Sequence, residues 1–405
     1  MHIKRRSFIK LSSLATASLF VPKFLNAMAQ DENATVPKGN KVLVVLQLSG
    51  GNDGLNTVIP FSNDIYYKSR PVIGLQKDKM LTLTDEVGIH SELSFFKSLY
   101  DEGNLGILNS VGYPVPDRSH FRSMDIWQSA SDSNKYLQTG WIGRYLDEQC
   151  MDCEMLTTAL EFDDTLSMAG RGVSQKALAA KDPARLLNNS KDAFLKSLTK
   201  MYQHDLHSIE HESPVDYLYK TMAATQSSAS YIFEKSNSKK TTATYPNTQL
   251  GKSMKTISSL ILSDANTQIY YVSIGSFDTH VDQIGRQAGL FKQINDAIEA
   301  FTNDLKANNK FEDVLLFTFS EFGRRVSQNA SKGTDHGTAN NMFFVGGGLK
   351  QKGLLNNMPD LEDLDAGDLK YKVDFKSVYA TVLKNWLGAD DEKILGKKME
   401  YLSFV

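Results

Sequence analysis

Acidic and histidine side chains recur along the sequence in short segments that also contain glycine, and most of these segments follow an apolar run. The residues are Asp53, Asp278, His280, Glu321, Asp335 and His336. Carboxylate oxygens and imidazole nitrogens are ligands that suit Zn, Mn or another divalent ion. A single Asp after a strand is more often a helix cap, and a single histidine is more often a structural residue. Taken together, the residues predict a shared polar or metal centre.

Asp278 and His280 are the most closely spaced pair among these residues. In extended backbone, side chains two residues apart point to the same side, so both can ligate one ion. In open α/β sheets, ligands bind beyond the carboxyl ends of the strands. The centre is therefore expected at that edge of a sheet.

Five apolar runs predict the strands that would position these residues. They span 41–48, 105–111, 268–274, 313–319 and 342–345. Continuous aliphatic and β-branched runs are typical of strands buried on both faces of a parallel sheet. Helical patterns lie between them, most clearly over 283–308, where an apolar stripe begins at Ile284. The alternation predicts an α/β fold with a mainly parallel central sheet and helices on both faces.

The segment after the second run reads Asp-Arg-Ser-His-Phe over residues 117–121. Ser119 is predicted to be the N-cap of a helix that contains Met124 and Trp127. A second helix is predicted over 374–388, with Gly388 as its stop. The start of the first helix is a favourable place for an anion, because a helix N-terminus carries partial positive charge.

The N-terminus has the features of an export signal. Arg5 and Arg6 precede a short apolar stretch, and Ala-Met-Ala over 27–29 resembles a cleavage site. The paired arginines indicate a twin-arginine signal over 1–29, read by the twin-arginine translocase, with a polar linker over 30–40. The apolar stretch is too short to span a bilayer. We therefore expect a periplasmic or extracellular protein with no transmembrane anchor after cleavage.

The composition of the 405-residue chain is that of an ordinary globular protein, at 41% hydrophobic and 23% charged residues. With 45 Lys and Arg against 47 Asp and Glu, it has no basic excess, which argues against a nucleic-acid partner. We expect one α/β domain over 41–405. A Ser-, Lys- and Thr-rich stretch at about 188–248 is predicted to be a helical and loop insertion or cap.

Other motifs in the sequence have plainer interpretations. Cys150 and Cys153 have no second pair for a zinc site, which favours a local disulfide or two core thiols. His204, His207 and His211 share a helical face with acidic neighbours, which favours a solvated surface over a metal site. No Gly-x-Gly-x-x-Gly, P-loop or Gly-x-Ser-x-Gly motif occurs, so dinucleotide-binding and ordinary α/β-hydrolase functions are disfavoured.

At these residues the chain resembles the twin-arginine-exported bacterial proteins of domain of unknown function 1501, within the alkaline-phosphatase-like and sulfatase-like superfamily. The matching blocks occur in order across nearly the whole mature chain. They are 48–56 (Leu-Ser-Gly-Gly-Asn-Asp-Gly-Leu-Asn), 118–121 (Arg-Ser-His-Phe), 277–280 (Phe-Asp-Thr-His), 320–324 (Ser-Glu-Phe-Gly-Arg), 334–337 (Thr-Asp-His-Gly) and 378–388.

The resemblance implies an alkaline-phosphatase-like fold and metal-assisted attack on a phosphate or sulfate ester. It implies that a divalent ion (Zn, Mn, Ca or Mg) is held by Asp53, Asp278, His280, Glu321 and His336, to which the residue pattern adds Asp335. Ser119 is the implied nucleophile, and Arg118 or Arg324 is implied to hold ester oxygens. The implied substrate is a small molecule or glycan that bears phosphate or sulfate.

The chain departs from the superfamily pattern at two places. Glu321-Phe322 stands where an Asp-His pair is usual, and Asp278 and His280 are two residues apart where four is usual. The alternative function is therefore a catalytically inactive member that binds an anionic glycan or a partner protein. Formylglycine sulfatase chemistry is disfavoured, because 119–123 lacks Pro or Ala at its third position.

Overall fold

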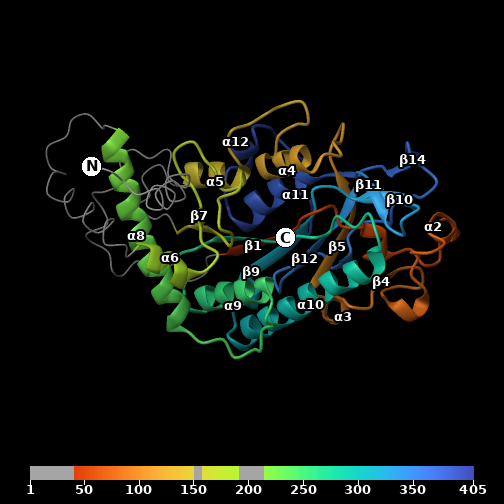
Figure 1. Cartoon of the computed structure of the whole chain (residues 1–405), viewed down its shortest axis with the longest axis horizontal. Coiled ribbons are helices and arrows are strands. Elements are labelled where there is room, and N and C mark those ends of the chain that lie inside the picture. The colour runs from red at the N-terminus through yellow and green to blue at the C-terminus, as the bar shows by residue number, and fades with distance from the viewer. Residues whose placement is uncertain (1–40, 150–156, 191–213) are drawn as a thin grey trace. The chain divides into compact units, whose positions relative to one another are not determined.

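The computed structural model of the chain describes residues 41–149, 157–190 and 214–405 (Figure 1). The predicted signal and linker, both cysteines and the three closely spaced histidines lie outside these residues. Within the described part of the chain, no helix is both long and apolar enough to cross a membrane.

The described residues form two compact units. The larger contains residues 41–137, 241–258 and 271–405, and the smaller contains the described residues of 138–240 and 259–270. All six predicted metal ligands lie in the larger unit.

The larger unit is built on the predicted mainly parallel sheet, with strand order β13-β5-β12-β9-β1-β8 and β16 paired to β5. The strands are β1 (Val42–Leu48), β5 (Leu105–Gly112), β8 (Ile269–Ile274), β9 (Val314–Phe319), β12 (Asn340–Val345), β13 (Gly353–Leu354) and β16 (Val373–Asp374). β1 runs parallel to β9 over six residue pairs. β12 is antiparallel to both neighbours. All five predicted strands are present, and the predicted fold class is confirmed.

Helices cover both faces of this sheet (Figure 1). On one face, Phe96 of α3 (Ser94–Asp101) meets Phe343 edge to face, with ring centroids 5.5 Å apart. On the other, Trp127 of α4 (His120–Ser129) stacks on Phe319, with ring centroids 5.1 Å apart. Successive side chains of a strand alternate between faces, so each helix layer has its own apolar set.

The longest helix at the ligand-bearing edge, α10 (Gln283–Ala307), matches the predicted helix closely. Its predicted apolar stripe is wrong at the first turn, because Ile284 is 41% exposed. Gln283 and Gln287 face inward there and make buried hydrogen bonds. The first turn packs against polar loops rather than an apolar sheet face, so polar side chains are required inside.

The remaining elements are short or lie at the margins. In the larger unit they include η1 (Gly54–Asn56), β2 (Val58–Ile59), α2 (Asp64–Ser69), η2 (Lys77–Lys79), β3 (Met80–Thr82), β4 (Gly88–His90), η3 (Phe311–Asp313), β10 (Arg324–Gln328), β11 (Thr334–His336), β14 (Leu364–Asp365), β15 (Asp368–Leu369), α11 (Phe375–Thr381), η4 (Val382–Trp386) and α12 (Asp391–Leu395). α11 and η4 form the predicted C-terminal helix, and Gly388 follows with φ of 68°.

The smaller unit is mixed helix and strand. It contains α5 (Trp141–Gln149), β6 (Ala159–Glu161), β7 (Leu178–Ala179), α6 (Pro183–Ser190) and α8 (Pro214–Ser238), and α9 (Gln249–Leu262) spans residues of both units. β6 and β7 pair in parallel. The single-domain organisation and the insertion at about 188–248 stay predictions.

Candidate metal centre

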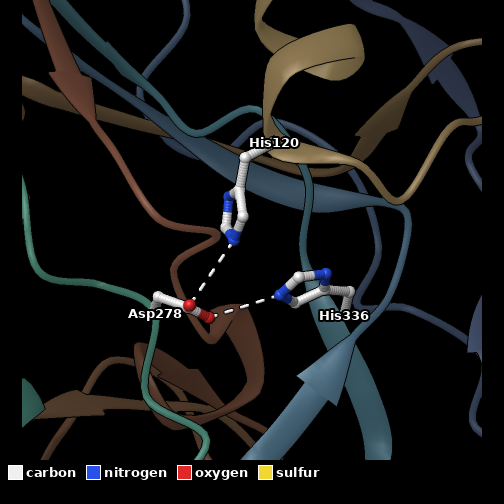
Figure 2. Close-up of side chains that lie close together, drawn as sticks. All are labelled: His120, Asp278 and His336. Carbon is white, nitrogen blue, oxygen red and sulfur yellow. Dashed lines mark hydrogen bonds and ion pairs between the residues drawn. The ribbon is translucent and has the colours of Figure 1, made fainter.

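Three side chains from separate segments converge at the ligand-bearing edge of the sheet (Figure 2). Asp278 follows β8, His336 ends β11 and His120 begins α4. One ligand atom from each lies within 4.8 Å of the others. Asp278 lies 158 residues after His120 and 58 residues before His336, so only the folded chain brings them together.

The donor atoms have the spacing that a metal ion requires. His336 Nε2 lies 3.3 Å from Asp278 Oδ1, and His120 Nε2 lies 3.6 Å from Asp278 Oδ2. His280 Nε2 lies 3.1 Å from Asp278 Oδ1 and 2.9 Å from His336 Nε2. Two ligands of a tetrahedral zinc ion, each about 2.0–2.1 Å from the metal, stand about 3.3 Å apart. These four donor-atom distances lie near this value.

The tautomer of His336 is set by the backbone. Its Nδ1 lies 2.9 Å from the carbonyl oxygen of Arg118. A carbonyl only accepts hydrogen bonds, so Nδ1 carries the proton and the Nε2 lone pair faces Asp278. Burial, with a further contribution from the charge of Arg324, lowers the pKa of His336 and favours its neutral form. A neutral histidine with a free Nε2 is the form that binds metal.

His120 is arranged in the same way through a carboxylate. Its Nδ1 lies 2.8 Å from Glu321 Oε1, and among the described residues its buried Nε2 has no hydrogen-bond partner. The hydrogen bond to Glu321 raises the pKa of His120. Carboxylate partners on the outer nitrogen are common for metal-binding histidines, where they orient the ring. A buried, unpartnered nitrogen beside a carboxylate fits a divalent cation.

Asp278 carries the negative charge of the group. Its side chain is 46% exposed, and its Oδ1 accepts a 2.7 Å hydrogen bond from Arg324 Nη2. Burial alone raises the pKa of Asp278, but the hydrogen bond and charge of Arg324 outweigh it and lower the pKa below its usual value. The carboxylate is therefore ionised at neutral pH, as a metal ligand must be.

Two predicted ligands, Glu321 and Asp335, contact histidines of the group on the nitrogen that faces away from Asp278. Glu321 also accepts from the backbone N–H of Gly50 at 2.8 Å, so its Oε1 is shared with the ring of His120. Asp335 Oδ1 lies 3.2 Å from His280 Nδ1 and accepts from Asn329 at 3.2 Å. The structure places both beside histidines of the group rather than among the converging donor atoms.

Asp53 lies elsewhere. Its Oδ2 accepts from Arg70 Nη1 at 2.6 Å, and both side chains are buried. Gln283 donates a second hydrogen bond to the same oxygen. Its Oδ1 caps η1 through the N–H of Leu55 at 3.2 Å. The carboxylate is thus paired within the protein, and the structure does not bring it into the group around Asp278.

The two predicted anion-holding arginines differ in exposure. Arg324 is 1% exposed, and each of its side-chain nitrogens donates to a backbone carbonyl, those of Gly51, Thr334 and Phe277 among them. Arg118 is 44% exposed at its side chain, and its Nε donates to the buried carboxylate of Asp368 at 2.8 Å.

Ser119 occupies the predicted N-cap position of α4. Its hydroxyl makes no capping hydrogen bond with the helix, and the residue is exposed. Its backbone N–H donates to Asp117 Oδ1 at 2.7 Å, which holds the turn into the helix. The nucleophile role of Ser119 stays a prediction.

Two glycines allow the ligand segments to approach each other. A Cβ on Gly50, where φ is 118°, would lie 2.5 Å from the backbone nitrogen of Asp278. A Cβ on Gly333 would lie 2.3 Å from the carbonyl carbon of His280. Real contacts of this kind are not that short, so the glycines preceding Asp53 and Asp335 serve close backbone packing.

Sequence reasoning missed three residues at this edge: His120, Arg70 and Gln283. His120 stands in the quoted Arg-Ser-His-Phe block, one residue before Phe121, and a histidine at a helix start after a strand was a usable signal. Arg70 and Gln283 gave no such signal, because their hydrogen bonds to Asp53 form only in the folded chain.

Comparison with known proteins identifies the family. The model of a family described as "Protein of unknown function (DUF1501)" matches residues 104–400. The chain belongs to this family. The family prediction is thereby confirmed, and all members of the group around Asp278 lie in the matched region. No curated protein matches the sequence.

Several solved structures resemble the chain at low identity. The lipoteichoic acid synthase LtaP from Listeria monocytogenes is 11% identical with a TM-score of 0.38, over 88% of this chain and 76% of that one. The PsFucS1 sulfatase from Pseudoalteromonas sp. is 12% identical with a TM-score of 0.39, over 99% and 75%. A protein in the alkaline phosphatase superfamily from Vibrio parahaemolyticus is 10% identical with a TM-score of 0.34, over 96% and 77%.

Proposed function

We propose that this protein is an exported, metal-dependent hydrolase of phosphate or sulfate esters. The observation that carries the proposal is the convergence of His120, Asp278 and His336, whose ligand atoms lie within 4.8 Å of one another. Both histidines direct Nε2 inward because Nδ1 is held by an acceptor of the protein. A preset lone pair of this kind supports metal binding.

In this proposal His120, Asp278, His280 and His336 hold the ion, and Glu321 and Asp335 orient two of the histidines. A bound divalent ion supplies Lewis acidity and lowers the pKa of a bound water or hydroxyl. A bound ion displaces any proton from the ligating nitrogens, so with the ion bound the four side chains contribute one negative charge, that of Asp278. The ion therefore keeps a net positive charge that an anionic ester can meet.

A second feature supports an anionic substrate. Asp368 is completely buried, and two guanidinium groups approach it: Arg118 Nε at 2.8 Å and Arg325 Nε at 3.5 Å. Two cations on one carboxylate leave an excess of positive charge. Both arginine side chains are about half exposed, at 44% and 40%. Guanidinium groups suit the oxygens of phosphate and sulfate, so these two are proposed to orient the ester.

The attacking group is proposed to be Ser119 or a water molecule. Ser119 lies directly before His120, at the N-terminus of α4, where the helix favours an anion. Its exposure leaves the hydroxyl accessible to a substrate. A Ser119→Ala variant separates the two routes, because it abolishes the first and spares the second.

Export completes the proposal. The paired arginines, apolar stretch and Ala-Met-Ala of the N-terminus support twin-arginine transport to the periplasm or beyond. That route carries folded proteins, so the metal would be loaded before export.

The deciding experiment measures metal content and hydrolysis on the same preparations. Wild type is expected to hold about one or two equivalents of a divalent transition metal. It is also expected to cleave 4-nitrophenyl phosphate or 4-nitrophenyl sulfate. His120→Ala and His336→Ala should lose both properties. His90→Ala is the matched control, since His90 is a buried histidine that stacks edge to face with Phe291 and accepts from the N–H of Glu92.

Two results would oppose the proposal in different ways. If wild type binds no metal after Zn²⁺ and Mn²⁺ are offered, the metal centre itself is refuted. If it binds metal but cleaves neither ester, the alternative is favoured: an inactive member that binds an anionic glycan or a partner protein. The two departures at Glu321-Phe322 and Asp278–His280 are the features that favour this alternative.

A further inference from the structure

The carboxamide of Gln283 lies behind the metal group and connects three segments. Gln283 is the first residue of α10 and is completely buried. Its Oε1 accepts hydrogen bonds from Thr279 Oγ1 at 3.2 Å and Thr334 Oγ1 at 2.7 Å. Its Nε2 donates to Asp53 Oδ2. Every one of these contacts is buried, so each is strong enough to fix a side chain.

Both threonines belong to the segments that carry the ligands. Thr279 lies between Asp278 and His280, and Thr334 lies two residues before His336. The two segments also touch through the backbone, since the N–H of Thr334 donates to the carbonyl of Thr279 at 3.3 Å. One oxygen of Gln283 therefore holds both segments that carry the ligands, through Thr279 and Thr334.

The direction of this carboxamide is dictated by a buried ion pair. Arg70 donates to Asp53 at 2.6 Å and also to the carbonyls of Val326 and Arg325, at 2.8 and 2.9 Å. Asp53 as a carboxylate only accepts hydrogen bonds, so the amide nitrogen of Gln283 must face it. The amide oxygen is then forced toward the threonines.

We propose that Gln283 is a positioning residue for the metal ligands, directed by the Arg70–Asp53 pair. The inference rests on the proposed function, because it assigns Gln283 a task only if Asp278, His280 and His336 bind an ion. Asp53 is thus proposed to orient the carboxamide of Gln283 and not to contact the ion itself.

Gln287 supplies a matched control. It lies one turn further along the same helix, is 2% exposed, and donates to Asn52 Oδ1 and to the carbonyl of Asp53, both at 3.0 Å. Its Oε1 also accepts a 3.4 Å hydrogen bond from Gln283 Nε2, but in the described structure no hydrogen bond from Gln287 reaches Thr279 or Thr334. Loss of Gln287 removes buried hydrogen bonds of the same chemistry without releasing the ligand segments.

The test compares Co²⁺ affinity and the visible absorption of the Co²⁺-loaded full-length protein in Gln283→Leu and Gln287→Leu. Gln283→Leu is expected to weaken binding by about tenfold and to change the absorption bands, since outer-shell partners affect affinity by about 10–100-fold. Gln287→Leu is expected to bind as wild type does. Both variants should lower the melting temperature, so stability alone does not separate them.

Exchanging the carboxylate and the carboxamide between positions 53 and 283 tests the same proposal and keeps polar side chains at both positions. Gln283→Glu places two carboxylates together and should weaken Co²⁺ binding. The double variant Asp53→Asn/Gln283→Glu restores the net charge and a donor opposite position 283, but the new amide also faces Arg70 Nη1, so it should recover part of the lost affinity. It also answers the question if Gln283→Leu does not fold.

The outcomes separate the two levels of inference. If wild type binds Co²⁺ and Gln283→Leu binds it equally well, or if the swap recovers nothing, the positioning role is refuted and the metal centre stands. If wild type binds no metal under any condition, the proposed function and the positioning role both fall.

Discussion

Asp53 and Asp278 each follow a strand of the sheet, but their exposure and their contacts differ. Each is contacted by a buried arginine: Arg70 for Asp53 and Arg324 for Asp278. Asp53 is 1% exposed, whereas the side chain of Asp278 is 46% exposed. One carboxylate is closed inside the protein, and the other is open to solvent and to histidines.

The two carboxylates differ in the groups that they contact besides the arginine. Around Asp53 the neighbours are donors, Gln283 Nε2 and the N–H of Leu55, which complete its hydrogen bonding. Around Asp278 the neighbours are imidazole nitrogens, two of which have their proton assigned to the far side of the ring. Lone pairs that converge on a carboxylate are unfavourable without a cation. An acidic residue after a strand is therefore placed to bind a metal where imidazole lone pairs, rather than hydrogen-bond donors, face the side of the carboxylate away from its arginine.

The largest expected effect is a loss of unfolding free energy when the buried Arg70–Asp53 ion pair is broken. Arg70→Met leaves Asp53 buried without a cation, and removing one partner of a buried pair costs about 3–5 kcal/mol. Urea unfolding, monitored by circular dichroism, measures the loss. The double variant Asp53→Asn/Arg70→Met is the control, and it should recover a large part of the loss, because no uncompensated charge remains. Equal losses in the single and double variants would show that the carboxylate is not what makes Arg70 necessary.

At the open carboxylate the expected effect shifts from stability to metal binding. Asp278→Asn should weaken Zn²⁺ or Co²⁺ binding by about 100-fold, equivalent to about 2.7 kcal/mol. The unfolding free energy of the metal-free protein should change by only about 1 kcal/mol, because water screens the half-exposed carboxylate and Arg324 keeps its hydrogen bonds to backbone carbonyls. Isothermal titration of metal and urea unfolding measure the two quantities separately.

Asp335→Asn is the matched comparison for this prediction. Asp335 is also a partly exposed carboxylate beside the group, but it bonds to the outer nitrogen of His280. Its loss should weaken metal binding by about tenfold. If Asp335→Asn weakened binding more than Asp278→Asn, the assignment of inner and outer residues would have to be reversed.

The fold could be read from the sequence to a large extent. The strands at 42–48, 105–112 and 314–319 and the helix Gln283–Ala307 follow from local periodicity, which depends on neighbouring residues only. The first turn of that helix was the exception. Ile284 fitted the apolar stripe by spacing, and only the polar loops packed against the helix explain why Gln283 and Gln287 take the inner face.

The site could be read only in part. Residue type and position after a strand placed Asp278, His280 and His336 in one region, and the structure brings them together. The same rule selected Asp53, whose partner Arg70 lies 17 residues further along the chain. No periodicity reports which cation meets which carboxylate, since that depends on how loops 250 residues apart pack. For the same reason, the Nδ1 partners of His120 and His336 were invisible.

A third carboxylate extends the comparison to one that is buried and that no arginine of the described residues contacts. Glu161 of β6 accepts two hydrogen bonds from Ser167, at 2.9 and 3.0 Å, and burial raises its pKa to about 7. The folded state therefore binds this proton more tightly than the unfolded chain does. Its contribution to stability is fully present below about pH 4.5, the unfolded pKa, and is lost as pH rises through about 7.

Between pH 5 and 7 this loss amounts to about 2 kcal/mol. Glu161→Gln should remove it, so the difference in unfolding free energy between variant and wild type should move in favour of the variant by that amount across the interval. Thermal and urea unfolding at several pH values measure it. A parallel pH dependence in both proteins would mean that Glu161 is charged in the folded state and paired more effectively than its contacts indicate.

The smallest expected effect concerns the hydrogen bond that sets the tautomer of His336. Asp368 holds the Arg118 side chain, and the carbonyl of Arg118 accepts from His336 Nδ1. Asp368→Asn keeps an acceptor for Arg118 but removes the charge. We therefore expect metal affinity to fall by about three- to tenfold, at the lower end for an outer partner. Nitrogen chemical shifts of the imidazole in the metal-free protein should show part of the population with the proton moved to Nε2.

Asp363→Asn is the appropriate control for this last effect. Asp363 precedes the same β14–β15 hairpin and pairs with Lys370 at the surface, so its loss perturbs the hairpin without touching Arg118. It should leave both metal affinity and the histidine tautomer unchanged. If Asp363→Asn and Asp368→Asn weakened binding equally, the hairpin as a whole would matter and not the charge beneath Arg118. Metal binding at Asp278 would then depend on the packing around it, as the hydrogen bonding of Asp53 does.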